Sequence, residues 1–227
     1  MVSDPGDASV DGREVSLDGR RAAGEATRAR LVRTAGRLFA RKGIDVVSVR
    51  EICDAAEVNT AAIHYHFGSK QGLVKAIIED WAAELAVRRA RWLDRLEADP
   101  GADLRAVVAA LVHPIADLAA DSERGGHDYV AFLTAVLSDP AYMSLIIDAY
   151  EEQTARELAA LDRVTPHLSE AERMIRFSLA KDLINRTLGN GQGPVRLWLD
   201  RYAPGTDLPE QLVDFITGAF AQRPNLG

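Results

Sequence analysis

The chain is short of several features that common classes of protein require. Its 227 residues include a single cysteine, Cys53, which excludes an intramolecular disulfide framework and is typical of a reducing compartment. No apolar run approaches the ~20 residues that a membrane-spanning helix needs. Residues 1–21 lack the basic start and the apolar stretch of a secretory signal. We therefore expect a cytoplasmic protein with no membrane partner.

Patterns typical of β-strands are scarce as well. Apart from a short VVSV at residues 46–49, no alternation of apolar and polar residues is bounded by turn signals. From Thr27 onward, apolar residues recur at helical spacing, divided by caps, glycines and prolines. The sequence predicts an all-α protein with helices over 27–42, 49–56, 59–66, 69–99, 102–120 (broken or kinked at His113–Pro114), 127–137, 139–162, 169–188 and 207–221.

The N-terminal quarter differs in composition from the rest. Residues 1–24 are rich in Gly, Asp and Ser without a periodic apolar face, so we expect a disordered tail. Residues 20–80 carry a net charge of +4, whereas residues 1–19 carry −4 and residues 81–227 carry −7. This asymmetry arises either by chance or because the basic segment has a polyanionic partner.

Two short helices in the basic segment have the spacing of a helix-turn-helix. Ser48 and Glu51 form a capping box that opens the first, and Asn59 is a good N-cap for the second. In such a unit the second helix lies in the DNA major groove, with its N-terminal residues on base edges. Ala61 and Ala62 keep that helix slim enough to enter the groove.

The His-Tyr-His stretch at residues 64–66 does not form a metal site on a helix. His64 and His66 are two residues apart and point ~200° away from each other. No Ser, Cys or acid stands close in sequence to act with them, and the five histidines include no H-E-x-x-H pattern. We expect no metal, no cofactor and no enzymatic activity, which leaves an all-α metal-dependent enzyme as a remote alternative.

Residues 27–80 resemble the N-terminal domain of the TetR family of transcriptional regulators. The matching features are LFARKGID, the capped SVREI helix, the small-residue helix that ends in Phe67, and the SK that opens the next helix. One departure is Ile63–His64, where family members usually have Leu-Tyr. The resemblance implies a ligand-responsive regulator, by family default a repressor, that binds a palindromic operator as a homodimer. A DNA-binding protein of the same fold without a ligand remains the alternative.

The resemblance also implies the organisation of the chain and its DNA contacts. A helix-turn-helix domain over 25–70 would follow the tail (1–24), and a long helix would join it to a ligand-binding and dimerisation bundle over 71–227. Bases or backbone would be contacted by Ser48, Arg50, Asn59, Thr60, Ala61 and His64. Phosphates would be held by Tyr65, His66 and Lys70, although Tyr65 also has a core interpretation.

The helix over 169–188 is apolar on two opposed faces. Met174, Phe177, Ile184 and Leu188 share one face, and Ile175, Leu179 and Leu183 share the other. Such a helix must bury both faces, either inside its own domain or against a second subunit. We expect a homodimer formed by helices 169–188 and 207–221.

An effector pocket inside the bundle is implied by the resemblance. Candidate lining residues combine an apolar body with a polar group, or serve as walls: Trp81, Trp92, His113, Tyr129, Phe132, Met143, Tyr150, Phe177 and Asn185. His113 is the first candidate, because Pro114 frees a nearby carbonyl. With few basic residues expected to face inward, we expect an uncharged or weakly acidic organic molecule.

Overall fold

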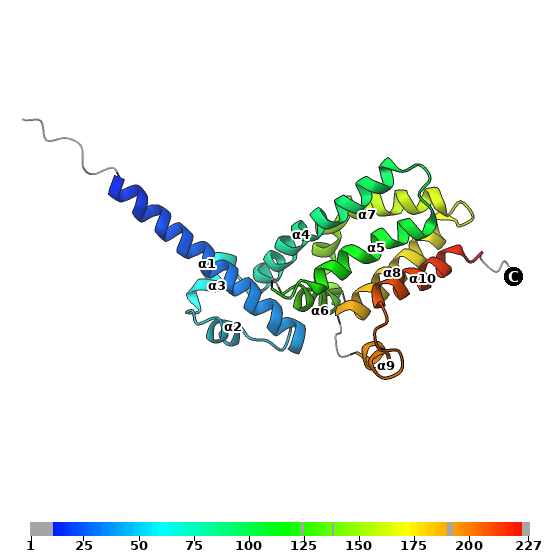
Figure 1. The fold of residues 1–227 in the computed structure, drawn as a ribbon. Coiled ribbons are helices and arrows are strands. Elements are labelled where there is room, and N and C mark those ends of the chain that lie inside the picture. The colour runs from blue at the N-terminus through cyan, green and yellow to red at the C-terminus, as the bar shows by residue number, and fades with distance from the viewer. Residues whose placement is uncertain (1–10, 124, 138, 190–192, 224–227) are drawn as a thin grey trace, which may run out of the picture.

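The computed structural model describes residues 11–123, 125–137, 139–189 and 193–223, and these residues form helices and connections with no strand (Figure 1). This confirms the predicted all-α class. The helices are α1 (Asp11–Lys42), α2 (Val49–Ala55), α3 (Ala61–Phe67), α4 (Lys70–Ala98), α5 (Leu104–Ala120), α6 (Gly126–Leu137), α7 (Met143–Val164), α8 (Glu170–Gly189), α9 (Pro194–Tyr202) and α10 (Leu208–Ala221), with a 3₁₀ turn, η1 (Pro140–Tyr142), before α7.

The first three helices and the start of α4 share one small core. Leu31 and Phe39 of α1, Ile52 of α2, Ile63 of α3 and Leu73 of α4 are fully buried there. The Ser48 hydroxyl accepts from the amide of Glu51, and the Ser69 hydroxyl accepts from the amide of Gly72, so the predicted caps set the starts of α2 and α4. Both caps fix the short connections that hold α3.

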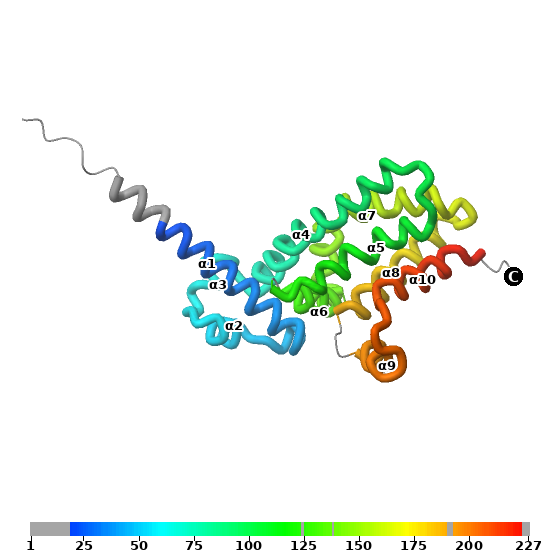
Figure 2. Tube along the Cα trace, in the orientation of Figure 1, coloured from blue at the N-terminus to red at the C-terminus, as the bar shows by residue number. Residues whose placement is uncertain are grey.

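The start of α1 differs from the expectation. We expected disorder over 1–24 and a helix from Thr27, but α1 begins at Asp11; residues 1–10 lie outside the described part. The segment contains good helix formers, and Arg21 and Glu25 form an i,i+4 ion pair of 3.3 Å. The part of α1 that Figure 2 draws in blue, from residue 19 on, begins away from the remaining helices.

Helix α4 joins the three-helix unit to a bundle of α5, α6, α7, α8 and α10 (Figure 1). Helix α1 also packs against α6 of the bundle, where Phe39 and Phe132 stack with ring centroids 6.1 Å apart. Arg28 of α1 donates to both carboxylate oxygens of Asp80 on α4, at 2.9 and 3.1 Å. The three-helix unit is therefore attached to the bundle through two helices, α4 and α6.

Two features of the C-terminal half were not predicted. Helix α5 is continuous from Leu104 to Ala120 with buried Pro114 inside it, so of the expected break or kink at His113–Pro114 the break is absent. Helix α9 lies where we expected only a loop after residue 188. It starts with Pro194 at its first turn, has no buried residue and projects from the bundle (Figure 1).

Within the described residues, no single helix has the length and apolarity to cross a membrane. Helix α6 and the following η1–α7 segment reach that length only as a pair, across a bend of 105°.

Candidate nucleic-acid interface and internal cavity

Helix α3 presents its N-terminal end and one side to solvent. Asn59, Thr60, Ala61, His64 and Tyr65 are exposed, while Ile63 is completely buried and fixes the rotation of the helix. The Asn59 carboxamide oxygen accepts from the amide of Ala62 at 3.0 Å, which makes it the effective cap predicted from the sequence. The four residues of this segment expected at bases, Asn59, Thr60, Ala61 and His64, therefore lie on one accessible surface with Tyr65, and their contact with DNA stays a prediction.

The ring of His64 has a defined orientation. Its Nδ1 lies 3.1 Å from the carbonyl oxygen of Gly68, at the C-terminus of α3. Because a carbonyl oxygen only accepts, Nδ1 carries the hydrogen, and neutral His64 presents Nε2 as an acceptor. An acceptor on this surface is suited to the amino group of adenine or cytosine in the major groove.

The residues expected at phosphates differ in how freely they reach solvent. Tyr65 is 84% exposed, which excludes its core interpretation. His66 is half-buried and packs edge-on against Tyr65, with ring centroids 4.9 Å apart. Lys70 is also half-buried: its Nζ lies 3.5 Å from the carbonyl oxygen of Asp45 and 5.9 Å from the ring centre of Phe39. Ser48 and Arg50 are exposed at the start of α2 beside this group.

The connections on either side of α3 are sterically tight. Glu57, between α2 and α3, has φ of +54°, a left-handed conformation that costs a non-glycine residue about 1 kcal/mol. A Cβ on Gly72 would stand 2.0 Å from the carbonyl oxygen of Phe67. Only glycine permits this approach of α4 to the end of α3, so Gly72 sets the angle between them.

The bundle contains a cavity of about 330 Å³ between α4, α6, α7 and α8. Four residues predicted for an effector pocket line it, namely Met143, Tyr150, Phe177 and Asn185. The other lining residues are Arg89, Leu133, Leu137, Ile146, Thr154, Ser178, Lys181 and Asp182. The sequence therefore indicated part of this lining, and its role as a ligand site stays a prediction.

Three charged side chains, the buried charge cluster of Arg89, Glu157 and Lys181, meet at this cavity. Arg89 Nε lies 3.3 Å from Glu157 Oε1, and Lys181 Nζ donates to both Glu157 oxygens at 3.1 and 3.2 Å. Burial, and then the positive charge of Arg89, lowers the pKa of Lys181 from 10.5 to about 8. Sequence reasoning missed this cluster.

Tyr129 and Tyr150 join the cavity to the three-helix unit. Their hydroxyl groups share a hydrogen bond, and burial raises the pKa of both, so both stay neutral. The ring of Tyr129 stacks on Trp81 of α4 with centroids 4.9 Å apart, and it also contacts Phe132. Phe132 in turn stacks on Phe39 of α1.

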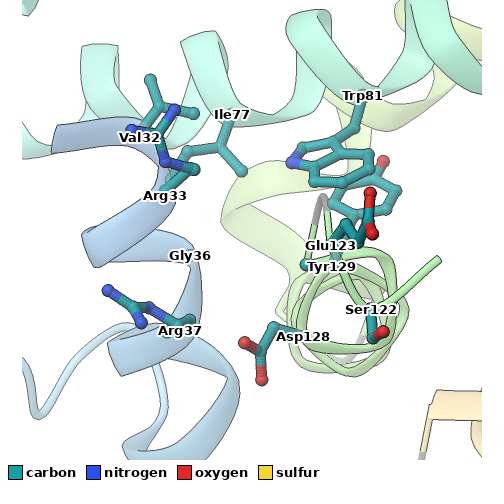
Figure 3. A pocket seen from close by; sticks show the side chains of 11 residues that line it. Val32, Arg33, Gly36, Arg37, Ile77, Trp81, Ser122, Glu123, Asp128 and Tyr129 are labelled. Carbon is teal, nitrogen blue, oxygen red and sulfur yellow. The ribbon is translucent and has the colours of Figure 1, made fainter. Parts of the chain in front are cut away.

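Trp81 and Tyr129 line a second hollow of about 280 Å³, between α1, α4 and the start of α6 (Figure 3). Arg37 of α1 and Asp128 of α6 face this hollow from opposite sides (Figure 3). The hollow lies at the junction of the three-helix unit with the bundle, outside the cavity described above.

Three of the predicted pocket residues lie elsewhere, which corrects that part of the expectation. Phe132 is fully buried in the core between α1 and α6. Trp92 and His113 stack on each other with centroids 5.0 Å apart, and His113 Nε2 lies 3.1 Å from Glu210 Oε1 on α10. His113 of α5 therefore packs against α4 and α10 through these two contacts. The proline beside it did not open a ligand site.

An exposed apolar face runs along α8. Ile175 and Leu179 are 60% and 65% exposed, whereas Phe177 and Ile184 are buried, so the helix has the two predicted faces. On α10, Phe215 is 68% exposed, whereas Leu212, Ile216 and Phe220 are buried within their own subunit. Helix α9 adds Trp198 and Tyr202, which are exposed and stacked on each other.

No group of three or more His, Cys, Asp or Glu side chains within the described residues is arranged to hold a metal ion. Cys53 is buried, and burial raises the pKa of its thiol.

Sequence comparison relates both halves of the chain to one family. The pattern described as "Bacterial regulatory proteins, tetR family" matches residues 31–77, and the pattern of a "Tetracyclin repressor-like, C-terminal domain" matches residues 109–219. The chain is 33% identical to the HTH-type transcriptional repressor KstR2 of Rhodococcus jostii over 82 residues, which are 36% of this chain and 38% of that protein. It is 31% identical to KstR2 of Mycolicibacterium smegmatis over 64 residues, or 28% and 31% of the two chains. The matches thus span well under two thirds of those relatives.

Solved structures share the fold over nearly the whole chain. A TetR-family transcriptional regulator from Bordetella parapertussis superposes with a TM-score of 0.58 at 17% identity, covering 86% of this chain and 94% of that one. A transcriptional regulator from Saccharomonospora viridis in complex with choline gives 0.54 at 19% identity, covering 87% and 94%. Together with the two family patterns, which cover more than half of the sequence, these findings establish that the chain belongs to the TetR family of bacterial transcriptional regulators, which are not enzymes.

Proposed function

We propose that this regulator binds a palindromic operator as a homodimer, represses transcription when unliganded, and leaves the DNA when a small organic effector enters the bundle. The observation that carries the proposal is the accessible surface of α3, with five residues exposed around the buried anchor Ile63. The two KstR2 relatives are repressors by name, and the S. viridis regulator is in complex with a small molecule, choline.

The homodimer follows from the exposed apolar face of α8 and α10. One α3 contacts too few bases for useful specificity, and a second copy one helical turn of DNA away, roughly 34–36 Å, supplies the other half-site. Ile175, Leu179 and Phe215 form an apolar surface that a second copy would cover by two-fold symmetry.

Release follows from how the cavity is connected to α1 and α4. Tyr150 lines the cavity and hydrogen-bonds Tyr129, whose ring contacts Trp81 of α4 and Phe132, the partner of Phe39 on α1. An effector that binds one arrangement of these aromatic side chains more tightly than another shifts the population of α4 orientations. The spacing of the two α3 helices then no longer fits the operator.

The test is selection of bound duplexes from a random pool, followed by fluorescence anisotropy on the selected DNA. We expect a palindromic sequence to be enriched. His64→Ala should reduce the discrimination between that sequence and single-base variants, because the Nε2 acceptor is lost. Lys70→Ala should weaken binding to all duplexes and lower the slope of log K against log salt by about one.

Arg196→Ala is the matched control for Lys70→Ala, since it removes one positive charge from exposed α9, far from α3. Its salt slope should equal that of the unmodified protein. If no duplex is enriched, or if Lys70→Ala and Arg196→Ala change the slope equally, the proposed DNA-binding surface is wrong.

A further inference from the structure

The buried charge cluster holds one more positive charge than negative charge. Glu157 supplies one carboxylate to two cations, Arg89 and Lys181, and its side chain has no exposed surface. The other carboxylate at the cavity, Asp182, is exposed and is held by Arg186 Nε at 2.7 and 2.9 Å. It therefore does not neutralise the cluster. A buried charge without a counterion is unfavourable unless another group compensates it.

Two polar atoms at the same cavity also lack hydrogen-bond partners. Arg89 Nε has no acceptor in hydrogen-bonding geometry, despite its proximity to Glu157, and Asn185 Oδ1 accepts no hydrogen bond from the described residues. Both side chains line the cavity and are more than nine-tenths buried, with 3% of Arg89 and 4% of Asn185 exposed. Each unpaired buried group costs roughly 1–3 kcal/mol, so both indicate a place for a bound molecule.

Much of the remaining lining is apolar and comes from three helices. Leu133 and Leu137 of α6, Met143 and Ile146 of α7, and Phe177 of α8 line the space. Exposed Ser178 and Asp182 mark the side of the cavity that meets solvent. A ligand that fits has a mainly apolar body and one charged end.

We propose that this cavity binds an organic monoanion, a carboxylic acid with an apolar body, whose carboxylate pairs with Arg89 and Lys181. A hydrogen-bond donor on the body of the ligand reaches Asn185 Oδ1. The proposal rests on the proposed function for what binding does to DNA affinity, and of the uncharged or weakly acidic ligand expected from the sequence it selects the acidic one. One ligand carboxylate brings the cluster to neutrality, with two cations and two anions.

Calorimetry with a matched series of probes tests the charge preference. Octanoate, octanamide and octylammonium share one apolar chain and differ in the charge of the end group, and 4-phenylbutyrate is a wider carboxylate. We expect octanoate to bind at least tenfold more tightly than octanamide, and octylammonium to bind most weakly. Equal affinities for octanoate and octanamide, tighter binding of octylammonium, or no binding of either carboxylate at millimolar concentration would overturn the proposal.

Two variants of Lys181 assign the preference to the cluster. Lys181→Met removes the unpaired charge and leaves Arg89 beside Glu157, so octanoate and octanamide should then bind within about twofold of each other. Lys181→Arg retains the charge and should retain the preference. If Lys181→Met still prefers octanoate tenfold, the anion is bound elsewhere and the proposed site is wrong.

Operator anisotropy with the same probes separates this inference from the proposed function. Binding of octanoate with the expected charge preference but without any change in operator affinity would support the site and contradict an effector role. Operator release by octanamide and octanoate at equal concentrations would support a ligand-responsive repressor and contradict the anion site.

Discussion

Replacing Lys181 with methionine should stabilise the unliganded protein near neutral pH, although it removes two hydrogen bonds to Glu157. Methionine has nearly the length of lysine and carries no charge. Arg89 remains 3.3 Å from Glu157, so the carboxylate keeps a cationic partner after the change. The substitution thus removes the positive charge by which the cluster exceeds its single carboxylate.

The magnitude follows from the pKa of Lys181. Its lowering from 10.5 to about 8 corresponds to roughly 3 kcal/mol that the folded state loses by keeping this lysine charged. Between pH 8 and pH 10.5 the unfolded chain holds a proton that the folded chain releases, so the free energy of unfolding rises with pH in that window. Below pH 8 both states are protonated and the penalty is present in full. Allowing for the lost hydrogen bonds, Lys181→Met should gain about 1–3 kcal/mol at pH 7.

Urea unfolding followed by circular dichroism, at one protein concentration and at pH 7, 9 and 10, measures this gain. The advantage of Lys181→Met over the unmodified protein should be largest at pH 7 and should shrink above pH 8. Lys75→Met is the matched control, because Lys75 is 56% exposed and pairs with Glu79 at 3.6 Å; it should change the free energy of unfolding by less than about 0.5 kcal/mol. A Lys181→Met variant that is less stable at pH 7, or whose difference is independent of pH, would refute the reasoning.

Three further predictions concern the cluster, the α3–α4 junction and the dimer. Glu157→Gln leaves both cations without a carboxylate and should lower the free energy of unfolding, measured in urea, by about 3–5 kcal/mol. Adding Lys181→Met to the same chain should restore part of that loss. Equal losses in the single and double variants would contradict this coupling. Gly72→Ala should lower operator affinity at least tenfold in anisotropy, because its Cβ would collide with the Phe67 carbonyl, whereas Gly36→Ala on α1 meets nothing within 4 Å and should bind normally. Leu179→Glu places a charge on the exposed face of α8 and should give a monomer in light scattering. Val87→Glu, at an exposed position of α4, should leave a dimer. A Leu179→Glu variant that remains a dimer would place the interface elsewhere.

The start of a helix was predictable from the sequence where the capping residue and its hydrogen-bond partner are only a few residues apart. The Ser169 amide donates to the Glu172 carboxylate at 2.8 Å, and the Asp207 carboxylate accepts from the amide of Glu210 at 3.2 Å, as their spacing indicated. Helix α9 was missed because the glycine-rich stretch before it suggested a loop throughout. Its own signals were present, with Pro194 in the first turn and Val195, Trp198 and Tyr202 at spacing i, i+3, i+7.

The two candidate sites differ in how far sequence reasoning reaches. The surface on α3 is built from a contiguous segment, so its exposed side follows from helical periodicity once Ile63 is assigned to the core. The cavity combines residues from four helices, and no local rule states which helix faces lie together. A charge at an apolar position was the available signal: Arg89 stands four residues after Leu85 and four before Leu93, both buried. Arg89 was not placed inside the bundle, so the expectation included uncharged ligands beside weakly acidic ones.

Residues that lower the stability of the free protein lie at the two sites for which a function is proposed. Glu57 adopts a left-handed conformation at the turn that aims α3, and Lys181 is charged at a cavity where methionine would be more stable. Sequences selected for folding alone favour glycine at the first position and an apolar side chain at the second. Retaining a glutamate and a lysine there lowers the stability of the free protein by amounts that a bound partner can return. For the cavity, that partner is an anion, because only a negative charge recovers what Lys181 and Arg89 lose by burial beside a single carboxylate.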